Sequence, residues 1–112
     1  MMSDATTIDY IAHDAARAKY VLIIREDRPW DHAEEMHEQL KRKVDTYFQY
    51  IMEGEVAKEY PGVTTDDCVI TLVCRQAPGA ESLAFFDYVR QVLAADSIEF
   101  NFLLHPGATA MG

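Results

Sequence analysis

Apolar residues that recur at steps of three and four predict one long amphipathic helix over residues 30–53. The apolar positions are Ala33, Met36, Leu40, Val44, Tyr47 and Ile51. Asp31 is the expected N-cap, because Glu34 three residues later completes a capping-box pattern. Gly54 is suited to end the helix, since it tolerates the left-handed conformation. One further turn is expected over residues 55–60.

Two segments have the apolar and β-branched composition of buried strands. Residues 19–26 (KYVLIIRE) and 68–75 (CVITLVCR) are apolar on both of their faces. A short strand is expected over residues 8–13, joined to the second strand by a polar turn.

The last third of the chain predicts a second helix and a fourth strand. Residues 81–95 carry a helical stripe that includes Phe86, Val89 and Leu93, and residues 98–104 alternate between apolar and polar positions.

The resulting order, β-β-α-β-α-β, predicts an α+β fold with two layers. Each helix returns the chain to the start of the sheet, so the last three strands run parallel and the first is antiparallel. If both crossovers are right-handed and continue in one direction, the order is 1-2-3-4 and both helices lie on one face of a four-stranded mixed sheet. In the alternative, the fourth strand inserts between the second and the third, and the helices cover opposite faces.

With both helices on one face, the other face of the sheet is bare. The side chains expected there form an apolar patch of Val21, Ile23, Val69, Val73 and Leu103. Because a patch of this kind usually marks an interface, the sequence predicts a homodimer through this face.

Length and charge restrict the class of protein. The 112 residues suit a single domain over 1–112, with a mobile small-residue tail at 106–112. Nineteen acidic against ten basic residues give a net charge of −9, which argues against nucleic acid or an anionic membrane as a partner. The basic cluster LKRK at residues 40–43 is expected to lie on the solvated side of its helix. The longest apolar run is too short to span a bilayer, and a cytoplasmic location is expected.

No metal, cofactor or catalytic motif is predicted. His32 and His37 are five residues apart, so their side chains lie about 140° from each other around a helix axis and do not share one ion. Cys68 and Cys74 lie about 20 Å apart on one extended strand, which is too far for a disulfide, and are expected to be reduced core thiols.

Polar side chains follow the strands at one edge of the predicted sheet, where ligands of parallel sheets often bind. The candidate binding residues are Arg25, Arg28, Trp30, His32, Arg75 and His105. These residues could bind a small anion or a peptide. In the alternative interpretation they bind no ligand: the charged side chains form a solvated rim, and Trp30 only anchors the entry to the helix.

Short segments of the chain resemble a known family. The opening IDYIAHD, the strand KYVLIIRED, the segment YFQYIMEGE, the pair Tyr60-Pro61 and the final EFNF are similar to a family of small bacterial proteins known only as a domain of unknown function. The similarity extends over residues 8–102, although Ala12 replaces a glycine expected in the opening strand. The resemblance implies a bacterial, cytoplasmic protein and no particular activity.

The leading hypothesis is therefore a non-enzymatic binding or accessory module that acts as a homodimer. An adaptor or an immunity-type inhibitor, whose acidic surface meets a basic protein partner, fits the composition. The alternative is a small-anion- or peptide-binding protein, or an enzyme, that uses the cluster at the strand ends.

Overall fold

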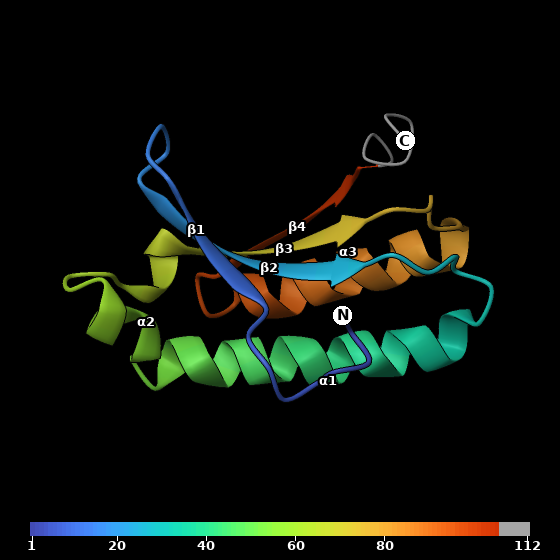
Figure 1. The fold of residues 1–112 in the computed structure, drawn as a ribbon, viewed down its shortest axis with the longest axis horizontal. Coiled ribbons are helices and arrows are strands. Elements are labelled where there is room, and N and C mark those ends of the chain that lie inside the picture. The colour runs from blue at the N-terminus through green and yellow to red at the C-terminus, as the bar shows by residue number, and fades with distance from the viewer. Residues whose placement is uncertain (106–112) are drawn as a thin grey trace.

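A computed structural model describes residues 1–105, which form a two-layer α+β fold (Figure 1). The elements in chain order are β1 (Tyr10–Asp14), β2 (Lys19–Glu26), α1 (Ala33–Met52), α2 (Glu55–Glu59), the 3-10 turn η1 (Thr65–Asp67), β3 (Cys68–Cys74), α3 (Ala80–Ala94) and β4 (Glu99–Leu104). The sheet has the order β1-β2-β3-β4, and only the β1–β2 pair is antiparallel. Helices α1 and α3 lie on the same side of it, so the predicted architecture is confirmed and the inserted fourth strand is wrong. The tail predicted for residues 106–112 lies outside the described residues.

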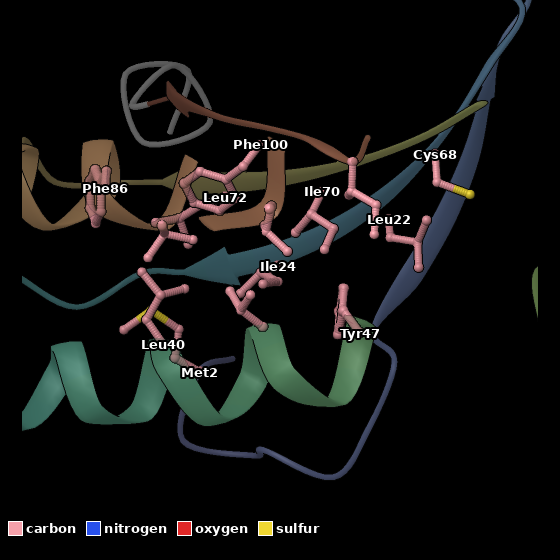
Figure 2. Packing of buried hydrophobic residues seen from close by; sticks show 14 of the residues in the cluster. Met2, Leu22, Ile24, Leu40, Tyr47, Cys68, Ile70, Leu72, Phe86 and Phe100 are labelled. Carbon is pink, nitrogen blue, oxygen red and sulfur yellow. The ribbon is translucent and has the colours of Figure 1, made fainter. Parts of the chain in front are cut away.

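The core lies between the sheet and the two long helices. Side chains alternate along a strand, so the even-numbered residues of β2 and β3 point toward the helices. Leu22, Ile24, Ile70 and Leu72 are each 0% exposed, and Figure 2 shows them facing Leu40 and Tyr47 of α1. The apolar stripe read from the sequence is therefore the buried face of α1.

The two ends of α1 are capped in different ways. The first helical hydrogen bond runs from the amide of Met36 to the carbonyl of His32, so His32 is the N-cap and makes no side-chain cap bond. The prediction of Asp31 as N-cap is wrong, because Asp31 lies one residue before the position whose side chain can reach the free amides. At the other end Gly54 has a φ of 78°, as predicted, and it separates α1 from the short helix α2.

A buried lysine of α1 binds the N-terminal segment, residues 4–9. The side chain of Lys43 is 0% exposed, and its Nζ donates to the carbonyls of Asp4 and Thr7 and to the Asp9 carboxylate. Because all three donors are used, the buried ammonium group has partners for each of its protons. The prediction that the LKRK cluster is solvated holds for Lys41 and Arg42 and is wrong for Lys43.

The hydroxyl of Tyr47 makes the second connection. It donates to the carbonyl of Ile23 in β2 at 2.7 Å and accepts from the amide of Asp9 at 2.9 Å. Met2, which precedes this segment, is 0% exposed in the core. The N-terminal segment is therefore held by two side chains of α1, and Tyr47 also joins α1 to β2.

Replacement of Lys43 tests the buried connection. We expect Lys43→Met to lower the free energy of unfolding by about 3 kcal/mol, because it leaves the Asp9 carboxylate and two carbonyls without their donor. Urea denaturation measures the change. Lys41→Met is the matched control on the exposed side of α1, and equal losses in the two variants would contradict the role of Lys43.

Backbone strain at Ser97 gives a second test. Ser97 closes α3 with a φ of 62°, where its amide donates to Ala94 and the next amide donates to Leu93. Since a Cβ atom is unfavourable in the left-handed region, Ser97→Gly is expected to raise the free energy of unfolding by about 1 kcal/mol. Ala84→Gly, at an exposed position in the interior of α3, is expected to lower it by about 1 kcal/mol. Thermal or urea unfolding that shows a loss in both variants would contradict this prediction.

Candidate functional site

The face of the sheet opposite the helices carries a hollow of about 530 Å³ near the carboxyl ends of β2 and β3. This face is called the open face below, and Figure 1 shows no helix on it. The residues that line the hollow are Asp9, Tyr10, Ile23, Arg25, Asp27, Val73, Arg75 and His105. The hollow therefore combines an apolar floor with charged side chains around it.

Three of the six predicted binding residues meet in this hollow. Arg25 pairs in register with Val73, and Arg75 follows two residues later on the same face. The sheet ladder continues through the amide of Arg75, which donates to Glu26, and the amide of His105, which donates to Cys74. The parallel pairing therefore places Arg25, Arg75 and His105 at one edge of the open face, as the sequence predicts.

The other three predicted residues lie elsewhere. Arg28 turns toward the helices and binds the Glu26 carboxylate with its Nε at 2.7 Å and its Nη2 at 2.6 Å. These bonds raise the pKa of Arg28. The ring of Trp30 packs against that of Phe86, with centroids 5.2 Å apart, and His32 is exposed at the start of α1.

A buried acid explains the position of Arg28. Glu26 is 0% exposed on the helix side of β2, where an unpaired carboxylate is costly. Arg28 supplies the counter-charge and also donates to Gln39, so its guanidinium is used within the fold. The even position of Glu26 in β2 is the sequence signal that could have separated Arg28 from Arg25.

Charge in the hollow is positive, although the whole chain is acidic. Neither Arg25 nor Arg75 forms an ion pair with another residue of the described part of the chain. Of the two acids that line the hollow, Asp9 is already paired with Lys43. Within the described part of the chain, the lining thus holds two arginines and one acid, Asp27, that take part in no ion pair. The excess of positive charge suits an anion.

The two cysteines are poor nucleophiles. Both are buried, and burial raises the pKa of Cys68 to about 11 and that of Cys74 to about 12. The thiolate that reacts with electrophiles is thus rare at neutral pH. Within residues 1–105, no group of three histidine, cysteine or acidic residues is placed to hold a metal ion.

A histidine and a serine form a hydrogen bond that sequence reasoning missed. Nε2 of His37 lies 2.8 Å from Oγ of Ser82, which is the kind of contact that activates a serine in hydrolases. Ser82 is only 1% exposed, however, so its hydroxyl is closed to a substrate. The pair therefore joins α1 to α3 as part of the packing.

The predicted dimer face is less exposed than its composition suggests. Val69 is 1% exposed and lies in register between Val21 of β2 and Glu99 of β4. On this side of the sheet, Arg17 of the β1–β2 turn forms an ion pair with Glu99 on the opposite edge of the sheet. Val21, Ile23 and Val73 are half-buried, and only Leu103 is largely exposed. Association through this face stays a prediction.

The fold and the hollow define a small two-layer α+β protein with a hollow on the bare face of its sheet. The chain belongs to DUF6572, a family of unknown function, whose model matches residues 1–106. No curated protein and no solved structure matches the chain at the threshold of the comparison. Within residues 1–105, every helix is too short or too polar to cross a bilayer.

The partial burial of His37 predicts that the stability of the fold depends on pH. Burial beside Phe85, whose ring stacks on the imidazole at 4.6 Å, lowers the pKa of His37. The unfolded chain thus binds a proton at a higher pH than the folded chain. The contribution of His37 to the free energy of unfolding is therefore fully present above about pH 6.5, the ordinary histidine pKa, and is lost as the pH falls through the lowered pKa.

Urea midpoints at pH 7.5 and 5.5 measure this effect. His37→Gln is expected to reduce the difference between the two midpoints, whereas His32→Gln, at an exposed position, should leave it unchanged. An unchanged difference in His37→Gln would show that other groups cause the loss.

Proposed function

We propose that this protein is a non-enzymatic binding module that takes a small organic acid in the hollow of the open face. The observation that carries the proposal is the pair Arg25 and Arg75, which line one hollow without any ion pair in the described part of the chain. An arginine without a partner, held at the carboxyl end of a parallel strand, is suited to a carboxylate.

The spacing of the two arginines supports one shared anionic group. Because Arg25 is opposite Val73, Arg75 is its diagonal neighbour on the adjacent strand. Strands about 4.8 Å apart and a rise of about 3.3 Å per residue place such diagonal neighbours about 8 Å apart, within reach of long side chains. The two guanidinium groups can therefore donate to the same carboxylate from two sides, with His105 on the strand beyond Arg75.

The floor and wall of the hollow favour an acid with an apolar body. Ile23 and Val73 are half-buried below the arginines, and Tyr10 is 59% exposed beside them. An aromatic or branched group would cover this apolar surface, which water otherwise contacts. The net charge of −9 disfavours ligands of high negative charge, so a single carboxylate fits best.

Two features support binding without catalysis. The cysteines are buried with raised pKa values, and Ser82 is closed to substrates. The side chains around the hollow supply charge and hydrogen-bond donors for recognition. An adaptor or immunity-type role with a basic protein partner stays a prediction from composition.

Titration with benzoate tests the proposed ligand class. We expect benzoate to shift the backbone amide resonances of residues 23–25 and 73–75 in two-dimensional NMR spectra. Arg25→Gln and Arg75→Gln should each weaken binding roughly tenfold or more, because each removes a charge-assisted hydrogen bond of about 1.5–3 kcal/mol.

Arg42→Gln is the matched control, since Arg42 is an exposed arginine on α1. It should leave the affinity for benzoate unchanged. The proposal fails if neither benzoate nor 4-methylpentanoate shifts these resonances, or if all three arginine variants bind equally.

A further inference from the structure

The outer side of β4 is an open strand edge. β4 is last in the sheet order and pairs only with β3. The amide of His105 donates to Cys74 of β3, so the odd-numbered residues of this strand direct their backbone groups inward. In a parallel pair, alternate residues bond to opposite neighbours, and the amides and carbonyls of Phe100, Phe102 and Leu104 therefore point outward. Within residues 1–105 they have no backbone partner.

This edge lacks two of the features that usually protect a strand from pairing, and its one charged residue, Glu99, is bound to Arg17. Its sequence, EFNFLL, contains no lysine and no proline, and it pairs regularly with β3 from Glu99 to Leu104. Leu103 and Leu104 are 54% and 48% exposed. An apolar edge of this kind is a template for another strand.

A second hollow lies beside the edge, on the helix side of the sheet. It has a volume of about 260 Å³ between β4 and α3. Its apolar lining is formed by Leu83, Phe86, Phe100 and Phe102. The rings of Phe86 and Phe102 lie 5.1 Å apart, and Leu83 is 42% exposed. A strand added to β4 would place apolar side chains at this hollow.

We propose that the strand added at this edge is β4 of a second copy of the chain, running antiparallel. The two sheets then form one continuous sheet with all long helices on the same side. A two-fold axis through Phe102 aligns the whole strand with its counterpart, and the association is isologous. This proposal is independent of the ligand proposed for the open face.

The register about Phe102 is self-complementary. It sets Phe100 opposite the partner's Leu104, and the outward backbone groups of these residues then exchange hydrogen bonds across the axis. The partner's Leu104 lies on the helix side, at the apolar hollow. On the open face, Glu99, which is bound to Arg17 of its own chain, is opposite the partner's His105, so this register brings no two acids together.

The edge accounts for the exposed Leu104 better than association through the open face does. Leu104 has its side chain on the helix side and would remain exposed in an open-face dimer, whereas the β4 edge covers it. Edge pairing leaves the hollow around Arg25 and Arg75 uncovered on each copy. Both copies can then bind a ligand on the same face of the joined sheet.

Light scattering after size exclusion, at several protein concentrations, measures the oligomeric state. The wild-type chain is expected at twice its 12.7 kDa mass. Leu104→Pro should give a monomer, because it removes an outward amide at the edge and keeps the inward bonds to β3. Leu103→Lys, on the open face, should remain a dimer. A monomeric wild type, or a dimer that Leu103→Lys abolishes and Leu104→Pro does not, overturns the proposal.

Hydrogen exchange on the wild-type protein tests the edge without relying on a variant that folds. The amides of Phe100, Phe102 and Leu104 should be protected at high concentration and exchange at least tenfold faster on dilution. If these amides exchange at the same fast rate at every concentration while the dimer persists, the copies do not meet at β4. Circular dichroism of Leu104→Pro confirms whether the monomer retains its fold.

Discussion

Placement of both long helices on one face of the sheet is the constraint on which the other properties of this protein depend. It gathers the apolar side chains of β2 and β3 against α1 and α3, where Ile24, Ile70 and Leu72 are fully buried. The same placement leaves the opposite face without a covering layer (Figure 1). The odd-numbered side chains of the strands point away from the core, so a charged residue such as Arg25 can occupy one of these positions.

A buried cation links the stability of the fold to the charge of the candidate site. Lys43 holds the N-terminal segment through three acceptors, one of which is the carboxylate of Asp9. Asp9 also lines the hollow of the open face. Because its carboxylate is bound to Lys43, it does not neutralise Arg25 or Arg75, and the hollow keeps its positive character in an acidic protein.

The sequence placed residues of the candidate site on the right face where strand periodicity decided the geometry, and ligand binding there stays a proposal. Arg25 and Arg75 follow parallel strands at the same edge, and their odd positions place them on one face. Arg28 and Lys43 were misplaced because each binds an acid that was not recognised as its partner, Glu26 two residues away for Arg28 and Asp9 34 residues away for Lys43. Arg28 is drawn to the buried Glu26, and Lys43 lies in phase with Leu40 and Tyr47, a signal that its charge obscured. The N-cap of α1 was missed by one residue for a local reason, the position of the first helical bond.

Local patterns of apolar residues were enough to assign each helix and strand, because periods of two and 3.6 residues act within a few turns of chain. The bounds of β2 and the order of the elements followed from them. Only the tertiary structure decided which charges neutralise each other, since Asp9 and Lys43 are 34 residues apart in the chain and meet only when the layers pack. It also decided that β4 has a free edge, because an edge is a property of the assembled sheet and of no single strand.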